Sequence, residues 1–430
     1  MTKSPPLRLG IAGLGTVGIG VIRILRKHAA MLEARAGRPV VLSAVSARSR
    51  EKDRGVNLSG YAWEDDPVHL ATRDDVDVYI ELMGGESGPA KASVEAALGA
   101  GKHVVTANKA LLAHHGQPLA IAAENAGVAL RFEAAVAGGI PVVKALTEGL
   151  AANEITRVMG VMNGTCNYIL TRMYNADLPY EEVFQEASAL GYLEADPTLD
   201  VGGIDAGHKL ALLASIAFGT QVDFDGIEIE GIERISISDI EHAADLGYRI
   251  KLLGVAQLTG RGLEQRMSPC LVPATSPLGQ LEGGTNMVVI EGDAVEQVVL
   301  RGPGAGEGPT ASAVMGDVMD IARGLVIPAF GQPAASLKTA PPALAATPAP
   351  YYLRLHLLDK PGALGKVAVV LGEAGVSIDR MRQYGHDARL APVLIVTHKT
   401  TRAALDLALE GLERTNVVDG APVAIRIETV

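Results

Sequence analysis

Residues 7–32, "LRLGIAGLGTVGIGVIRILRKHAAML", contain the strongest indication of the fold of the N-terminal part of the chain. This stretch begins with an apolar run typical of a buried strand and continues from residue 16 with apolar side chains at helical spacing. The loop between them has the pattern G-x-G-x-x-G, in which glycines let the backbone approach a pyrophosphate at a helix N-terminus. Because a strand precedes this loop and a helix follows it, we predict a dinucleotide site rather than a plain tight turn. The predicted cofactor contacts are Gly13, Leu14, Gly15, Thr16, Val17 and Gly18.

Strands and helices alternate beyond this unit. Apolar runs at 40–47, 76–83 and 103–107 indicate strands, and residues 89–101 have a helical pattern. This alternation is typical of βαβ units around a buried parallel sheet. We therefore predict an α/β, Rossmann-type nucleotide-binding domain over residues 1–135.

A second glycine-rich loop opens residues 301–322, "RGPGAGEGPTASAVMGDVMDIA", where four glycines precede Pro309 and a helical run. Proline in a first helical turn is a helix-start signal. The position of this loop suggests that the chain returns to the first domain, which residues 301–330 would complete. Gly304 and Gly306 would then contact the cofactor, although the loop could also be a simple crossover between domains.

The residues after the second predicted strand bear on the choice of nucleotide. An NAD site usually ends this strand with Asp or Glu, which binds the ribose hydroxyls. Here the sequence is "AVSARSREK" (44–52), with no acid before Glu51 and with Arg48 placed to pair with a 2′-phosphate. We expect NADP(H) to be preferred and NAD(H) to be possible. The alternative is that these cations are solvated loop residues.

Composition excludes several classes of protein. The formal charge of −11 argues against a nucleic-acid surface. No apolar run approaches the roughly 20 residues that cross a membrane, and the N-terminus lacks the layout of a signal peptide. Two cysteines, with no HxxxH or CxxC spacing, disfavour a disulfide framework and a catalytic transition metal. We expect a cytoplasmic protein that acts on a small molecule and has no nucleic-acid or membrane partner.

The rest of the chain divides into a second domain, a linker and a third domain. Residues 136–300 contain longer helical segments, and we predict an α+β domain there. Residues 335–350, "ASLKTAPPALAATPAP", contain four prolines and no periodic core pattern, which is typical of a linker. Residues 351–430 follow the order strand, helix, strand, strand, helix, strand, which predicts a ferredoxin-like fold.

Asp205 and Lys209 lie four residues apart in "VGGIDAGHKLALL" (201–213). In a helix that begins near Ile204, steps of about 100° place Lys209 inside the apolar stripe of Leu212 and Ile216. A solvated ion pair belongs on the opposite face, so we predict that this pair points inward; the alternative is snorkelling at the helix end. A buried lysine beside a carboxylate can exchange a proton with a substrate oxygen. Together with a nicotinamide cofactor, this chemistry suits alcohol–carbonyl interconversion.

Other charged residues are candidates for the same site. Lys109 follows the strand at 103–107, at the carboxyl edge where open α/β sheets bind ligands, although it could also be a surface lysine at a helix start. Glu194, Asp196 and Asp200 are more acids than a proton transfer requires. They would suit a substrate that carries an ammonium group.

These motifs resemble the homoserine dehydrogenase family with a C-terminal ACT regulatory domain. The resemblance covers nearly the whole chain and rests on "GLGTVG", "TANKALL", "FEAAVAGGIPVV", "VMNGTCNYILT", "EASALGYLEADPTLDVGGIDAGHKL" and "GPGAGEGPTASAV" in this order. It implies reversible NAD(P)H-dependent reduction of L-aspartate 4-semialdehyde to L-homoserine, on the route to threonine, methionine and isoleucine. It also implies that residues 136–300 bind substrate and dimerise, giving a homodimer or a higher homo-oligomer.

The resemblance assigns roles to the candidate residues. It implies that Lys209 is the acid/base residue at the substrate oxygen and that Lys109 is a second essential lysine, between cofactor and substrate. Glu194 and Asp205 match the carboxylates that hold the amino group and order the site, and Asp200 matches a further acid of that cluster. The substrate-contacting loop of the family corresponds to Gly164 and Thr165.

The segment "FEAAVAGGIPVV" (132–143) resembles the monovalent-cation loop of the family, in which backbone carbonyls bind sodium. The corresponding residues are Glu133, Val136, Gly138 and Ile140. The implied role is structural, at the junction between domains. Without the resemblance, the segment would be interpreted as a glycine-rich hinge.

The segment "LLDKPGALGKVAVVLGEAGVSID" (357–379) resembles the ACT signature. The implied effector site includes Asp359, Gly362, Ala363 and Leu364, and the implied effector is threonine. The alternative is a dimerisation module that binds no effector.

Cys166 departs from the family pattern, because a small hydroxyl residue is expected at its position in "NGTCNYIL". A nucleophilic cysteine would make the chain an acylating semialdehyde dehydrogenase, but hydride reduction to an alcohol needs no covalent intermediate. We interpret Cys166 as a small packing residue. A third hypothesis is a nucleotide-binding amino-acid sensor without turnover, which would have no need of an inward proton donor.

Overall fold

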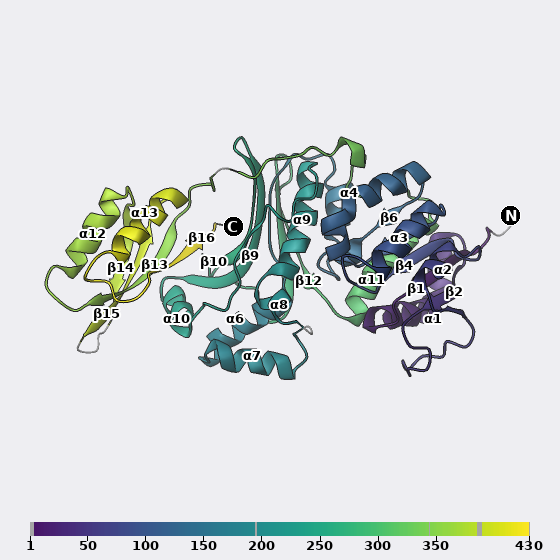
Figure 1. Ribbon diagram of the computed structural model, residues 1–430, viewed down its shortest axis with the longest axis horizontal. Helices are drawn as coiled ribbons and strands as arrows, with labels where there is room; N and C mark the ends of the chain where they lie inside the picture. The colour runs from purple at the N-terminus through teal and green to yellow at the C-terminus, as the bar shows by residue number, and fades with distance from the viewer. Residues whose placement is uncertain (1–3, 194–195, 344, 385–388, 430) are drawn as a thin grey trace.

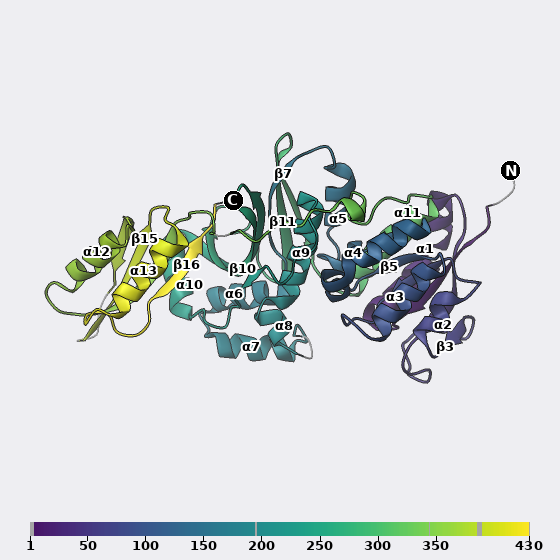
Figure 2. The same cartoon turned by 45° about the horizontal axis from the view of Figure 1, so that its top comes forward.

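The computed structural model describes residues 4–193, 196–343, 345–384 and 389–429. Three parts lie in a row along the longest axis: an N-terminal part in purple and blue, a central part in teal, and a C-terminal part in yellow-green (Figure 1). The same order is visible after rotation (Figure 2). Among the described residues, no helix has both the length and the apolar character needed to cross a membrane.

The N-terminal part is an α/β domain built on a parallel sheet, as predicted. Its six strands lie in the order β3-β2-β1-β4-β5-β6. The strands are β1 (Leu7–Ala12), β2 (Val40–Ser46), β3 (Ala62–Glu64), β4 (Val78–Glu81), β5 (His103–Thr106) and β6 (Leu130–Arg131). The helices between them are α1 (Thr16–Ala36), α2 (Pro67–Thr72), α3 (Pro89–Gly99) and α4 (Lys109–Ala126).

The returning segment reaches this domain as helix α11 (Glu307–Ala322), which packs against α1. The two helices approach closely at Gly20, where an added Cβ would lie 2.9 Å from the carbonyl oxygen of Glu307. Val314, Met315 and Val318 of α11 share one hydrophobic core with α1 and β1. The glycine loop and the returning loop therefore lie on the same domain.

The central part combines helices with long strands, in agreement with the predicted α+β domain. Its long strands pair antiparallel, and β9, β10 and β11 are buried over most of their length, as expected for strands covered on both faces. The strands are β7 (Ile155–Val161), β8 (Glu228–Ile229), β9 (Tyr248–Thr259), β10 (Gly262–Pro273), β11 (Thr285–Gly292) and β12 (Glu296–Pro303). The helical segments are η1 (Glu133–Ala135), α5 (Val142–Lys144), η2 (Ala145–Gly149), α6 (Gly164–Ala176), α7 (Tyr180–Ala189), α8 (Thr198–Val201), α9 (Ile204–Phe218) and α10 (Ile237–Asp245).

The C-terminal part has the predicted ferredoxin-like order. Its elements are β13 (Tyr351–Leu358), α12 (Ala363–Glu373), β14 (Ile378–Gln383), β15 (Leu390–Thr397), α13 (Arg402–Glu413) and β16 (Val423–Ile427). Its strand β16 pairs in parallel with β10, so the sheet runs from the central part into the C-terminal part without a break. Buried Asp239 of α10 also pairs with Arg354 of β13 at 2.6 Å. The sequence pattern predicted a separate four-stranded unit. The pairing of its strand β16 with β10 of the central part was not predicted.

The proline-rich segment 335–350 begins within the short helix η3 (Ala334–Ser336), and its described residues contact the central part. Lys338 and Pro342 form isolated bridges to Thr220 and Leu263. The segment is therefore an extended connection that contacts the domain it crosses.

Candidate active site

A cavity of about 500 Å³ lies between the N-terminal and central parts. Its wall combines the N-terminus of α1, the end of β5, the N-termini of α6 and α9, and the loop before α11. The lining includes Val17, Lys109, Gly138, Asn163, Gly164, Thr165, Tyr192, Asp200, Asp205, Lys209, Gly284, Asn286, Gly304 and Gly306. The structure thus brings together the predicted lysines, two of the predicted acids and both glycine loops.

Helix α9 begins at Ile204 and turns its charged pair inward, as the helical phase predicted. Gly203 precedes it with a φ of 84°, a conformation that other residues rarely adopt. Asp205 and Lys209 are only 7% and 8% exposed. The Lys209 Nζ lies 2.5 Å from Asp205 Oδ2 and donates to the carbonyl oxygen of Met162 at 2.9 Å. Two oxygens therefore fix the direction of this ammonium group.

Lys109 approaches the same carboxylate from the N-terminal domain. It is the first residue of α4, whose N-terminus Asn108 caps by accepting a hydrogen bond from the Leu111 amide at 3.1 Å. The Lys109 Nζ lies 2.9 Å from Asp205 Oδ1. Burial alone would raise the pKa of Asp205, but the two ammonium groups hold that pKa well below its ordinary value. Asp205 therefore stays ionised between two lysines and links the two domains.

Asn163 orders the acids, and the sequence analysis missed it. Its Nδ2 donates to Asp200 Oδ1 at 3.0 Å and to Asp205 Oδ2 at 3.4 Å. Its Oδ1 caps α6 by accepting a hydrogen bond from the Cys166 amide at 2.8 Å. An asparagine directly before a predicted helix is a capping signal, and that signal could have identified it.

The predicted substrate loop lies at the N-terminus of α6. Gly164 faces the backbone of Gly284, and an added Cβ would lie 2.6 Å from that carbonyl oxygen. Thr165 Oγ1 donates to the carbonyl oxygen of Tyr192 at 2.9 Å. Glu194, predicted to hold the substrate's amino group, lies outside the described residues.

Asn286 is a second residue that the sequence analysis missed. It lines the cavity between Gly164 and Gly304 and is 1% exposed. Its Oδ1 has no hydrogen-bond partner among the described residues. A buried acceptor in this position is available to a donor group of a ligand. No local motif marks this residue.

The glycine loop has the shape of a nucleotide cradle. An added Cβ at Gly13 would lie 2.4 Å from the Leu82 carbonyl oxygen, whereas at Gly15 it would meet no atom within 4 Å. Gly15 therefore leaves open space at the N-terminus of α1, where a pyrophosphate fits. Leu14 is buried in the core, so only its backbone can face a nucleotide. Arg48 is exposed just beyond the end of β2.

The predicted cation loop surrounds η1. The carbonyl oxygens of Glu133 and Ile140 already accept hydrogen bonds from the amides of Val136 and Val142, at 3.3 and 2.8 Å. Gly138, with a φ of 30°, packs against the Gly304 backbone beside the cavity. Gly138 therefore lies at the junction of the domains, and the carbonyl groups of Glu133 and Ile140 also serve the local backbone.

The Glu133 carboxylate serves the backbone as well. It accepts hydrogen bonds from the amides of Val143 and Lys144, at 3.0 and 2.8 Å. Burial and the nearby Asp317 raise its pKa to about 7. This side chain is thus a buried helix cap rather than an open ligand.

The geometry around Cys166 opposes a nucleophilic role. The side chain is fully buried, and its thiol donates to the Asp200 carbonyl oxygen at 3.3 Å. Burial, with the carboxylates of Asp200 and Asp205 nearby, raises the pKa of the thiol well above its ordinary value. A thiol with a raised pKa is a poor nucleophile, so the structure favours the packing interpretation.

The predicted effector residues do not join this cavity. Asp359 and Gly362 are exposed, Ala363 is buried, and all lie at the N-terminus of α12 in the C-terminal part (Figure 1). Gly362 has a φ of 82° and precedes the helix directly. Leu364 packs against the core of this part.

Comparison with known proteins shows the same organisation along the whole chain. The chain is 43% identical to a homoserine dehydrogenase of Neisseria gonorrhoeae, covering 99% of both chains. It is 42% identical to a homoserine dehydrogenase of Pseudomonas aeruginosa, covering 98% of this chain and 99% of that one. A solved homoserine dehydrogenase structure from Thiobacillus denitrificans is 38% identical, with a TM-score of 0.93 and 99% coverage of both chains.

Family models match each part of the chain. The NAD-binding domain of homoserine dehydrogenase matches residues 13–133, homoserine dehydrogenase itself matches residues 141–319, and the ACT domain matches residues 351–415. These matches agree with the α/β domain, the central domain with its inward lysine, and the ferredoxin-like domain. The chain belongs to the homoserine dehydrogenase family, NAD(P)-dependent oxidoreductases that act on CH–OH groups.

Proposed function

We propose that the chain catalyses the reversible reduction of L-aspartate 4-semialdehyde to L-homoserine and that Lys209 is the acid/base residue. The observation that carries this assignment is the row Lys209–Asp205–Lys109 in the wall of a cavity that also contains the glycine loop. A nicotinamide nucleotide bound at that loop supplies the hydride. The Lys209 ammonium donates the proton to the carbonyl oxygen, and in the reverse direction the neutral amine accepts it.

The neighbouring residues hold the reactants in place. Asp205 orients Lys209 and Lys109, and the positive charge of Lys109 stabilises negative charge that develops on the substrate oxygen. Glu194 and Asp205 bind the substrate's ammonium group with Asp200 as a further acid of that cluster, while Gly164 and Thr165 contact the substrate. Thr165 is itself held by the Tyr192 carbonyl group.

The preferred nucleotide in this proposal is NADP(H). Exposed Arg48 follows β2, where a guanidinium group can pair with a 2′-phosphate, and no acid replaces it before Glu51. A sodium ion on the carbonyl groups of Glu133, Val136, Gly138 and Ile140 would stabilise the domain junction. A hard cation suits oxygen ligands of this kind.

Regulation and assembly complete the proposal. Threonine would bind at the loop formed by Asp359, Gly362, Ala363 and Leu364, and the continuous sheet through β16 and β10 would connect this domain to the catalytic one. The chain would act as a homodimer or a higher homo-oligomer in the biosynthesis of threonine, methionine and isoleucine.

Initial rates with L-homoserine and each nucleotide, with and without threonine, test these statements together. We expect homoserine-dependent reduction of NADP⁺, a higher kcat/KM with NADP⁺ than with NAD⁺, and inhibition by threonine. Binding of NADPH and threonine without turnover would favour a sensor. Phosphate-dependent formation of an acyl phosphate would favour the acylating alternative.

A further inference from the structure

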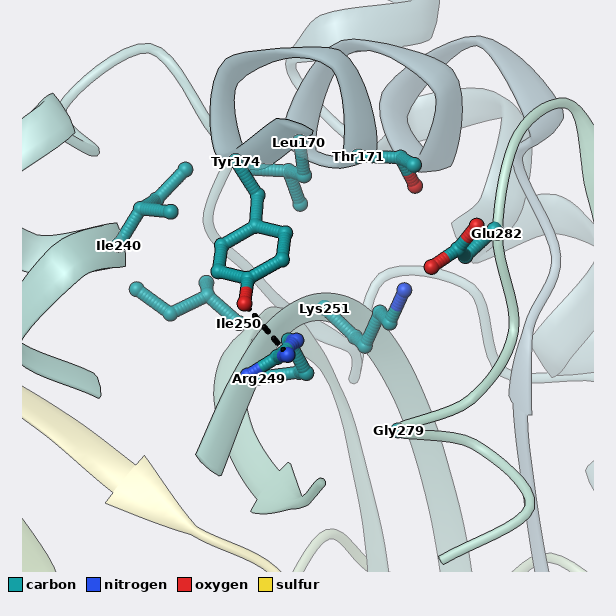
Figure 3. A pocket seen from close by; sticks show the side chains of 9 residues that line it. All are labelled: Leu170, Thr171, Tyr174, Ile240, Arg249, Ile250, Lys251, Gly279 and Glu282. Carbon is teal, nitrogen blue, oxygen red and sulfur yellow. Dashed lines mark hydrogen bonds between the residues drawn. The ribbon is translucent and has the colours of Figure 1, made fainter. Parts of the chain in front are cut away.

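Lys251 is a buried lysine of the central part that the proposed chemistry does not use. It lies on β9, is 3% exposed, and extends beneath α6 (Figure 3). Tyr174 and Arg249 close one side of this small pocket, and Thr171 and Glu282 lie on the other. Burial lowers the pKa of Lys251 to about 8. Burial of an ammonium group lowers the stability of the folded protein, so the contacts that Lys251 makes in return can indicate its role.

The ammonium group of Lys251 sets the orientation of one amide. It donates to Asn167 Oδ1 at 2.9 Å and to the Leu281 carbonyl oxygen. An ammonium group can only donate, so the amide oxygen must face Lys251 and the Nδ2 must face the opposite way. That Nδ2 donates to the carbonyl oxygen of Gly283 at 2.7 Å, with longer contacts to Leu281 and Thr285 at 3.4 and 3.5 Å.

Residues 281–285, held by these bonds, reach the candidate active site. Gly284 lies against Gly164, where a Cβ added at Gly164 would be 2.6 Å from the Gly284 carbonyl oxygen, and close to the ring of Tyr192. Asn286 follows directly and lines the cavity. A displacement of residues 281–285 would therefore move the wall where the substrate loop lies.

We propose that Lys251 and Asn167 are positioning residues that hold residues 281–285 against the substrate loop and so set the affinity for the amino-acid substrate. This inference rests on the proposed function, in which Gly164 and Thr165 contact that substrate. Neither residue lines the cavity, and the nucleotide cradle belongs to another domain. Their loss should therefore raise KM for homoserine much more than KM for the nucleotide.

Asn167→Asp is the sharpest test. The new carboxylate is the same size and pairs with Lys251, but it cannot donate to the Gly283 carbonyl oxygen. Because a hydrogen bond within a charged network contributes a factor of about ten, we expect KM for homoserine to rise about tenfold. KM for NADP⁺ should stay within about twofold and kcat within about threefold. Wild-type turnover, measured first, tests the proposed function separately.

Arg249→Met is the matched control. Arg249 lies two residues before Lys251 on the same strand, but its side chain donates to the Tyr174 hydroxyl at 2.8 Å at the outer edge of the pocket. We expect its KM values to match the wild type. Lys251→Met is the second variant, and it should raise KM for homoserine as Asn167→Asp does.

Three results would overturn the inference. The first is an unchanged KM for homoserine in Asn167→Asp, whether or not Lys251→Met is soluble. The second is an equal rise in KM for the nucleotide, and the third is an equal effect of Arg249→Met. Each of these would show that the contacts stabilise the domain without positioning the substrate wall.

Discussion

Two buried lysines of the central domain have opposite surroundings. Lys209 on α9 contacts the Asp205 carboxylate and opens onto the cavity. Lys251 on β9 contacts the neutral oxygens of Asn167 and Leu281, beneath α6. The first is paired with an ionised partner, whereas burial lowers the pKa of the second to about 8. We therefore propose proton transfer for the first lysine and loop positioning for the second.

The contrast also shows what makes a buried base suitable for catalysis. The carboxylate at 2.5 Å and the Met162 carbonyl oxygen hold the Lys209 ammonium group at the wall of the cavity. The neutral acceptors, together with the carboxylate of Glu282, do not compensate for the loss of water around Lys251, but the acceptors fix the geometry of its neighbours. Substitution of Lys209 should therefore lower kcat, whereas substitution of Lys251 should raise KM for homoserine.

The largest effect should follow from Lys209→Ala. Removal of the general acid should lower kcat by about 10²–10⁴-fold, with little change in affinity for NADPH. Steady-state rates and fluorescence titration with NADPH measure the two quantities. A parallel loss of nucleotide affinity would mean that Lys209 supports binding, and the contrast with Lys251 would fail.

Asp205→Asn should have the next largest effect. The amide removes the carboxylate that contacts the ammonium groups of Lys109 and Lys209, and a hydrogen bond to a charged group is worth about 1.5–3 kcal/mol. We expect kcat/KM for homoserine to fall about ten- to hundredfold. The melting temperature should also fall, because the carboxylate links the two domains. A variant with wild-type kinetics would show that the Asp205 carboxylate is not required for catalysis.

Cys166→Ser should change the rates only slightly. A serine hydroxyl can donate to the Asp200 carbonyl oxygen as the thiol does, so we expect kcat within about threefold of the wild type. Homoserine-dependent NADP⁺ reduction that survives the substitution separates this enzyme from the acylating alternative. Complete loss of activity in a folded variant would reopen the nucleophilic role.

His208→Phe should produce the smallest effect, visible only as a function of pH. His208 precedes Lys209 on α9, and burial, together with His114 and Lys109, lowers its pKa from 6.5 to about 4. Between these two pH values the unfolded chain binds the extra proton, so this group makes the wild type lose stability as the pH falls. The phenylalanine ring of the variant would keep the contact with Phe224 and cannot titrate.

The measurement is the melting temperature of the wild type and of His208→Phe at pH 7.5 and pH 5. The melting temperature of the wild type should fall more than that of His208→Phe between pH 7.5 and pH 5. Equal losses would show that His208 titrates normally in the folded protein.

Local patterns predicted the features that depend on neighbouring residues. The strand, glycine loop and helix at residues 7–32 predicted the nucleotide domain, and the spacing of Asp205 and Lys209 predicted an inward pair. Asn167, Lys251 and Leu281 come from three distant segments, so no periodicity connects them. The pairing of β10 with β16 and the position of Asn286 also depend on tertiary packing.

The central claim is that the Lys209 amine transfers the proton at the substrate oxygen. Its most direct test is the kcat of Lys209→Ala with and without added methylamine, which can occupy the space left by the side chain. We expect a very low kcat that rises with methylamine concentration, while Lys251→Met shows no such rise. A near-normal kcat without the amine would show that Lys209 does not transfer the proton.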